Sequence, residues 1–127
     1  MKVSVQVSGS FQNTQAFLER MRRREQFAVL HKYGAIGVAA LKGATPVDHS
    51  DTANAWSYEI VDRPGYFAIH WLNSHLDDDG RAPVAILIQY GHATGTGGRV
   101  QGRDFINPVM RPIFDQMAID MWREVTR

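Results

Sequence analysis

The chain has 127 residues, of which 44% are hydrophobic and 21% are charged, and its formal net charge at pH 7 is +1. A domain of this size buries roughly two-thirds of the surface that its unfolded chain exposes, so we expect one globular domain over residues 1–127. The small net charge gives no global field that would attract nucleic acid. The absence of cysteine excludes disulfides, thiolate zinc sites and cysteine nucleophiles.

The N-terminal part predicts a strand and then a long helical region. Residues 3–7 alternate apolar and polar side chains, as a strand with one buried face does, and they lack the unbroken apolar run of a signal peptide. Apolar residues at helical spacing follow over residues 13–43, in two patches of different phase, so we expect a kink or two helices near Arg24. Gly34 and Gly37 would let another backbone approach this helix closely.

The middle of the chain predicts a β-hairpin. Aromatic and aliphatic residues alternate with other residues over residues 56–71, around a turn with proline and glycine at residues 62–65. A mostly polar link at residues 46–52 precedes the hairpin. The apolar run within residues 83–90 fits either a buried strand or a short helix, because periodicity does not separate the two in so short a segment.

The C-terminal part predicts an amphipathic helix. Pro112 is best accommodated in a first helical turn, so residues 107–111 could form a separate entry turn. Together these elements predict an α+β fold with a long N-terminal helical region, a small antiparallel sheet around the central hairpin, and the C-terminal helix packed on the sheet. The expected buried stripe of that helix consists of Met110, Ile113, Phe114, Met117, Ala118, Met121 and Val125.

A glycine-rich segment, GHATGTGGRVQGRDF at residues 91–105, precedes the C-terminal helix. Its glycine spacing resembles a phosphate-binding loop, but Arg103 and Asp104 stand where such a loop has lysine and a magnesium-binding hydroxyl, and the dinucleotide pattern lacks its third glycine. Phe105 and the three residues after it also separate the segment from the helix start that would bind a phosphate. We therefore expect a mobile surface loop, with no nucleotide or other cofactor bound.

The sequence offers no strong catalytic constellation. His70, His75 and Asp77 are the best candidates for a small metal-dependent hydrolase or nuclease. The two histidines lie too close in sequence to surround one ion as nuclease histidines do, and the chain has neither a zinc-protease helix motif nor a nucleophile elbow. We therefore expect no catalytic, cofactor or metal residues, with His70 packed on the hairpin and Asp77 in a solvated turn.

Three short segments stand in a fixed order: residues 44–48 (ATPVD), residues 88–92 (IQYGH) and residues 102–108 (GRDFINP). In this order they resemble the APVDTG-like, IEYGT-like and RPFLRPA-like segments of the tail-completion, or head–tail joining, family of long-tailed bacteriophages. Gln89 stands where that family usually has an acidic residue. Residues 97–103 are similar to a GGxVxGR form that some members have.

The resemblance implies a structural virion protein and not an enzyme. Such proteins are thought to form a ring at the neck, so the chain would be a homo-oligomer, expected to be hexameric, that assembles in the host cytoplasm without a membrane. Its partners would be the tail terminator, tail tube and head–tail connector proteins, with DNA contacted only through the ring lumen. Another neck ring, such as the tail terminator itself, is the alternative.

Under this interpretation a part of the glycine-rich segment grips a neighbouring protein, because aromatic residues and arginine dominate such contacts. Phe105 could equally pin the last helix to the core. The residues expected to contact partners are Tyr90, Gly91, Gly97, Gly98, Arg99, Arg103 and Phe105.

Overall fold

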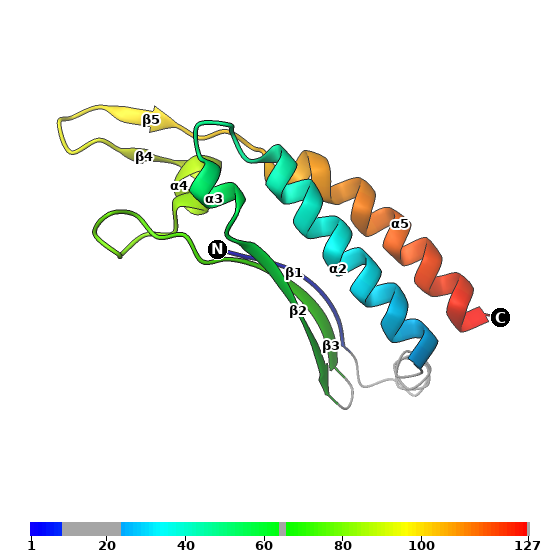
Figure 1. The fold of residues 1–127 in the computed structure, drawn as a ribbon. Helices are drawn as coiled ribbons and strands as arrows, with labels where there is room; N and C mark the ends of the chain where they lie inside the picture. Colours follow the sequence, from blue (N-terminus) through cyan, green and yellow to red (C-terminus); the bar gives the residue numbers. More distant parts are fainter. Residues whose placement is uncertain (9–23, 64–65, 127) are drawn as a thin grey trace.

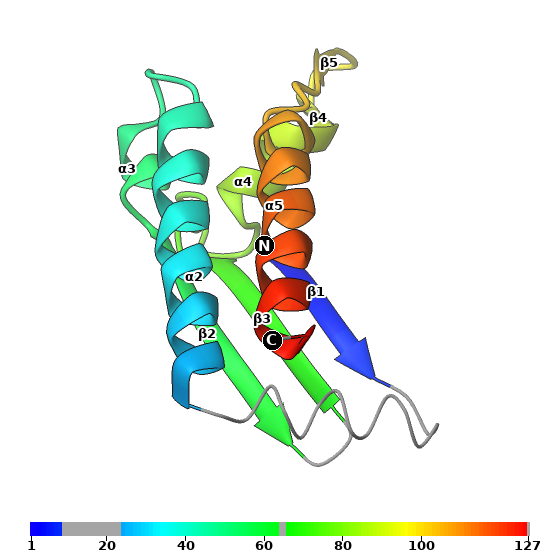
Figure 2. The same cartoon turned by 90° about the vertical axis from the view of Figure 1, so that its right-hand side faces the viewer.

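The computed structural model describes the backbone of residues 1–8, 24–63 and 66–126. Over these residues the fold is mixed α+β, with a three-stranded and a two-stranded antiparallel sheet. Two long helices lie side by side on one face of the larger sheet, and the smaller sheet projects away from them (Figures 1 and 2). The elements in chain order are β1 (Lys2–Ser8), α2 (Arg24–Ala44), α3 (Ser50–Ala53), β2 (Trp56–Arg63), β3 (Tyr66–Asn73), α4 (Val84–Tyr90), β4 (Gly91–Ala93), β5 (Arg99–Gln101) and α5 (Ile106–Thr126).

The three-stranded sheet has β3 at its centre, with β1 and β2 antiparallel on either side. The alternating sequence patterns predict both the β2–β3 hairpin and the strand at residues 3–7, and both predictions are confirmed. Trp71 lies opposite Tyr58 on β2 and opposite Val3 on β1, so these residues form one row across the sheet. Trp71 and Ile69 are fully buried, as a face covered by helices requires.

The α2 helix packs a glycine-containing face on the sheet, with Leu30 fully buried as the pattern predicts. A Cβ added to Gly34 would lie 2.3 Å from the Tyr58 ring, and one added to Gly37 would lie 2.2 Å from Trp71 Nε1. The two glycines therefore leave room for aromatic rings of the sheet, whereas the sequence predicted the close approach of another backbone. Trp71 Nε1 donates to the Gly34 carbonyl oxygen at 3.0 Å, which fixes the ring against the helix.

The C-terminal end of α2 lies where the sequence predicts it. The Thr45 N–H and hydroxyl donate to the Leu41 carbonyl oxygen at 3.0 and 2.7 Å, and Pro46 follows. Trp56 Nε1 donates to the same Thr45 hydroxyl at 3.0 Å, so the helix end is joined to the first residue of β2. Residues 13–23, where the sequence predicts the earlier helical segment and its kink, lie outside the described residues.

The α5 helix differs from the prediction at its start. It begins at Ile106, so residues 107–111 are helical and do not form a separate turn, and Pro112 lies inside the helix. A proline inside a helix costs about 3 kcal/mol, because a backbone hydrogen bond is lost and the ring clashes with the preceding turn. Burial of Ile106 and Met110 offsets this cost, since each buried apolar side chain contributes roughly 2 kcal/mol.

The predicted buried stripe of α5 is confirmed for most of its described members. Met117 and Met121 are buried, and the Phe114 ring packs against Trp71 with 5.9 Å between ring centroids. Ala118 is exposed, so its assignment to the stripe was wrong. It follows Met117 by one residue, a rotation of about 100° that turns its side chain away from the packed face.

Three segments whose structure the sequence left open are regular. The polar link before the hairpin contains the short helix α3, and the ambiguous apolar run forms the helix α4. Pro83 precedes α4, and Gly91 ends it with φ of 78°, a conformation that favours glycine. The glycine-rich segment, for which the sequence predicted a mobile surface loop, contains the β4–β5 hairpin.

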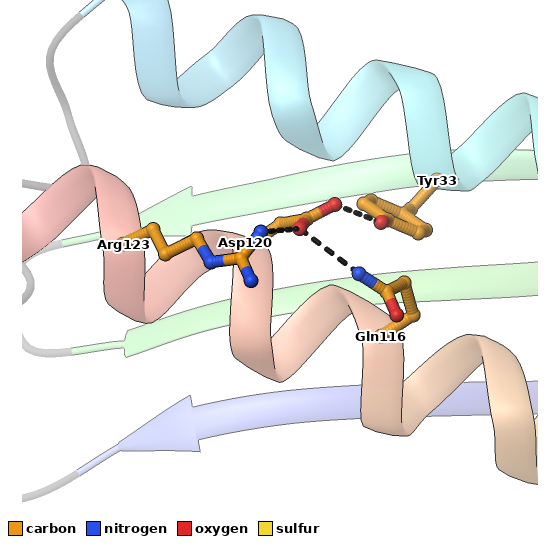
Figure 3. A network of polar contacts seen from close by, with 4 residues as sticks. All are labelled: Tyr33, Gln116, Asp120 and Arg123. Carbon is orange, nitrogen blue, oxygen red and sulfur yellow. Dashed lines mark hydrogen bonds and ion pairs between the residues drawn. The ribbon is translucent and has the colours of Figure 1, made fainter.

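Tyr33 and Asp120 join α2 to α5 through a hydrogen bond (Figure 3). The Tyr33 hydroxyl donates to Asp120 Oδ2, Gln116 Nε2 donates to Oδ1 at 3.1 Å, and Arg123 Nη1 lies 3.9 Å from Oδ1. Burial and, after it, the bond to Asp120 raise the pKa of Tyr33 to about 12. The same bond holds the pKa of Asp120 below its usual value.

Tyr33→Phe should lower the free energy of unfolding by about 1.5 kcal/mol at neutral pH, because a hydrogen bond to a charged group is lost. The Tyr33 contribution is complete below pH 10 and is lost as pH rises through about 12. The Asp120 contribution is complete above its usual pKa of 3.8 and is lost as pH falls through the lower folded value.

Urea unfolding of wild type and Tyr33→Phe at several pH values measures this contribution. The difference between them should be constant at intermediate pH and should shrink in acid. Tyr58→Phe is the matched control, since it removes only an exposed contact with His31 Nδ1 at 3.0 Å. An equal loss in both variants would mean that the Tyr33 bond does not fasten the helices.

Candidate protein-interaction site

A β-hairpin, here called the arm (residues 91–103), projects from the end of the helical layer (Figure 1). Its two strands pair antiparallel, with His92 opposite Val100. The Thr94 N–H donates to the Gly98 carbonyl oxygen at 3.1 Å across the turn. Gly97 has φ of 88°, a conformation that residues with a Cβ rarely adopt. Glycine is therefore required at this turn to connect the paired strands.

Close backbone approach ties the arm to the body at its base. A Cβ added to Gly91 would lie 2.4 Å from a carbonyl oxygen of β5, and one added to Gly102 would lie 2.6 Å from the Gln89 carbonyl oxygen. The Arg103 N–H donates to the Ile88 carbonyl oxygen at 2.8 Å. The end of α4 and the segment before α5 are therefore joined at the point where the arm leaves the body.

The Gln89 side chain connects the arm base to the start of α5. It is only 7% exposed, and its Oε1 accepts from the N–H groups of Phe105 and Ile106 at 3.2 and 3.3 Å. Its Nε2 donates to Asp104 Oδ1 at 2.7 Å, and Oδ1 also accepts from the Asn107 N–H at 3.2 Å. The Gln89 bond, followed by the Asn107 bonds, holds the pKa of Asp104 below its usual value.

These contacts differ from those that a phosphate-binding loop needs. A phosphate loop needs unpaired N–H groups at a helix start that faces the anion. At the start of α5 the N–H groups of Phe105 and Ile106 donate to Gln89 Oε1, and the Asn107 N–H donates to Asp104 Oδ1. A phosphate there would meet the Asp104 carboxylate. The geometry therefore opposes nucleotide binding at this position and leaves the arm as a projecting surface element.

A groove of about 340 Å³ lies between the arm, α4 and the link that follows α2. The α4 helix lines it with Val84, Leu87 and Ile88, which share one face at spacings of three and four residues. The arm contributes Val100, which is 47% exposed, and Arg103. The remaining lining residues are Pro46, Asp48, His49, His92 and Gln101. The lining therefore combines apolar side chains, three of them from α4, with polar and charged ones.

The structure brings together most of the residues that the sequence predicted for partner contact. Those on the arm or at its base are Tyr90, Gly91, Gly97, Gly98, Arg99 and Arg103. Tyr90 is 64% exposed, and its carbonyl oxygen accepts from Arg99 Nη2 at 3.1 Å. Tyr90 and the arm therefore present one continuous, exposed and basic element.

Phe105 lies apart from this exposed element. It is buried, and its ring centroid lies 6.5 Å from that of Trp56 in an edge-on arrangement. Of its two expected roles, this position fits the core contact that pins α5 to the sheet.

Sequence reasoning did not find Gln89, Asp104 or the groove as parts of this site. The sequence did not predict the apolar face that α4 turns toward the groove, because residues 83–90 fitted a strand as well as a helix. The spacing of Val84, Leu87 and Ile88 indicates one apolar face only if the segment is helical. The Gln89–Asp104 contact joins residues in different elements, so no local pattern signals it.

The candidate metal residues do not form one site. His70 Nδ1 lies 3.0 Å from Glu59 Oε1 on the sheet, and His75 Nδ1 lies 2.7 Å from the buried Thr52 hydroxyl. Asp77 Oδ1 accepts from two backbone N–H groups of its own turn, which lower its pKa. Within the described residues, no group of three or more histidine or carboxylate side chains could hold a metal ion.

Trypsin should cut native protein after Arg99 sooner than after Lys32. A two-stranded hairpin is only marginally stable by itself, so β5 should open at a lower free energy than the middle of α2. Mass spectrometry of short digests gives the order, and heat-unfolded protein is the control, in which both sites should be cut at similar rates. Earlier cleavage within α2 would show that the arm is the more stable element.

Comparison of the chain with family models, with curated proteins and with solved structures gave no match. Among the described residues, no helix has the length and apolar character needed to cross a membrane.

Proposed function

We propose that this chain is a structural virion protein of a tailed bacteriophage, a tail-completion component of the neck that forms a ring and joins the tail to the DNA-filled head. One observation carries the proposal. The segments that resemble this family, residues 44–48, 88–92 and 102–108, lie at the end of α2, the end of α4 and the start of α5, and they meet around the groove and the base of the arm.

The contacts between these segments support a structural reason for their order. The first segment ends α2 and contributes Pro46 and Asp48 to the groove. The second and third are fastened by the Arg103 N–H bond to Ile88 and by the Gln89 bond to Asp104. Together they hold the base of the projecting arm in a fixed position, which reduces the entropy that the arm loses on docking.

We also propose the helical region, the ring and the partners that the family resemblance implies. The N-terminal helical region would extend from about residue 13, and the ring, expected to be hexameric, would contact tail terminator, tail tube and connector proteins. DNA would pass through the lumen. The chain would act through these contacts and would have no catalytic role.

Electron microscopy of phage lysates that lack this protein tests the proposal. Filled heads and separate tails of normal length should accumulate, and added purified protein should restore joined particles. Tails of irregular length would point instead to a terminator, because a terminator ends growth of the tube. Normal, infectious tailed particles would refute a neck function of either kind.

Metal analysis of the purified protein tests the enzymatic alternative. The proposal expects no stoichiometric metal and full joining activity for His70→Ala and His75→Ala variants that fold. Bound metal that both substitutions remove, together with loss of joining, would favour a metal-dependent enzyme.

A further inference from the structure

We infer that the groove beside the arm binds a peptide segment of another protein, in which aliphatic side chains lie between a basic and an acidic residue. Only the expectation of a protein partner rests on the proposed function. The chemistry of the segment follows from the residues that line the groove, from their charges and from their exposure.

Apolar side chains from three parts of the chain meet in this groove. Val84, Leu87 and Ile88 of α4 line it, together with Pro46 of the link after α2 and Val100 of the arm. Figure 1 shows these three parts at one end of the fold. Val100 is exposed, so aliphatic side chains of a partner that cover it would remove apolar surface from water.

The groove also carries one positive and one negative charge, which belong to different parts of the chain. Arg103 comes from the arm and Asp48 from the link. No ion pair joins them, and among the described residues the Arg103 guanidinium has no hydrogen-bond or ion-pair partner. Asp48 lies 3.9 Å from His49 Nε2 and pairs with no lysine or arginine in the described part of the chain. The two charges cancel in sum, so the lining complements a partner that brings one charge of each sign.

The exposure of the lining favours a long occupant over a small molecule. Small-molecule sites enclose most of their ligand, whereas the Asp48 side chain is 75% exposed and both Val100 and Arg103 are exposed. Two strongly exposed apolar residues, Val47 and Tyr90, adjoin the link and the arm. Exposed apolar residues that gather at one end of a protein mark an interaction surface, and a peptide segment can extend beyond the groove toward them. A nucleic acid would instead bring phosphates to the Asp48 carboxylate.

Four short peptides with blocked ends test the inference by NMR titration of isotope-labelled full-length protein. All have two central leucines, and their outer residues are lysine and glutamate, two lysines, two glutamates or two serines. The lysine–glutamate peptide should bind wild type at least about threefold more tightly than the others, because each exposed ion pair contributes up to about fivefold in affinity. The backbone amide signals of Leu87, Ile88 and Val100 should shift on binding, since these residues line the groove.

Charge-reversal variants should change which peptide binds best. Arg103→Glu makes both charges of the groove negative and should favour the peptide with two lysines. Asp48→Lys makes both charges positive and should favour the peptide with two glutamates. Both side chains are exposed, so neither change disturbs a buried contact. Val100→Asp should weaken the binding of all four peptides, because it replaces apolar lining with a carboxylate.

Arg81→Glu and Asp78→Lys are the matched controls. They make the same changes of charge at exposed residues of the turn after β3, and neither residue lines the groove. Salt screens charges outside the groove over about 8 Å at physiological ionic strength, so both variants should keep the wild-type preference.

Equal binding of the four peptides to wild type would overturn the inference. Unchanged preferences in both charge-reversal variants, or amide shifts that miss the groove for every peptide, would do the same. Reversible self-association of wild type that Arg103→Glu abolishes would also overturn it, because the occupant would then be a second copy of this chain.

The lysate experiment gives a separate result. Normal particles without this protein would remove the neck function and leave the measured peptide preference intact. Unjoined heads and tails, together with equal binding of all four peptides, would keep the neck function and remove only the chemistry inferred for the partner segment.

Discussion

Gly37→Ala is expected to lower the free energy of unfolding by about 3 kcal/mol. The added Cβ would lie 2.2 Å from Trp71 Nε1, and Trp71 is fully buried and hydrogen-bonded to Gly34. Overpacking costs about 1–3 kcal/mol, and an unpaired buried N–H costs a further 1–3 kcal/mol if the ring shifts. The better helix propensity of alanine returns only about 1 kcal/mol.

Gly43→Ala is the matched control in the same helix. Nothing lies within 4 Å of a Cβ at Gly43, so this variant should be as stable as wild type or more stable by up to about 1 kcal/mol. Urea unfolding followed by circular dichroism measures both variants. Equal stability of Gly37→Ala and wild type would show that Trp71 can move away from α2 at little cost, and that its bond to Gly34 contributes little.

The features that the sequence predicted correctly are those with local causes. The β2–β3 hairpin follows from alternation and a turn within 16 residues, and the end of α2 follows from glycine and proline close to it. The closeness of approach at Gly34 and Gly37 was also foreseen. The sequence did not predict that the approaching groups are aromatic rings, because Tyr58 and Trp71 contact these glycines only after the sheet has folded against α2.

The features that the sequence did not predict depend on contacts between distant elements. Pro112 inside α5 conflicts with local preference, and burial of the preceding helical turn outweighs that preference. The arm residues were identified because glycine and arginine stand out in a short segment. The groove beneath them needs α4, the arm and the link near Pro46 to be placed side by side, and no spacing along the chain encodes that arrangement.

Gln89→Glu is expected to lower the free energy of unfolding by about 2–3 kcal/mol at neutral pH, because it removes a buried donor to a charged group and places a second carboxyl group beside Asp104. Gln89 Nε2 donates to Asp104 Oδ1 at 2.7 Å, and a carboxylate in its place would face another carboxylate. One of two such carboxyl groups retains a proton, so its folded pKa rises above the unfolded value of about 4.3. The penalty is therefore absent below that unfolded value and grows as pH rises through the raised folded value.

Adding Asp104→Asn to Gln89→Glu should restore most of the lost stability. The new amide can donate to the new carboxylate, which can still accept from the N–H groups of Phe105 and Ile106 at the positive end of α5. Thermal unfolding at acid and neutral pH measures wild type, both single variants and the double variant. If the double variant is no more stable than Gln89→Glu at neutral pH, carboxylate repulsion is not the cause of the loss, and the shape of the glutamine side chain must account for it.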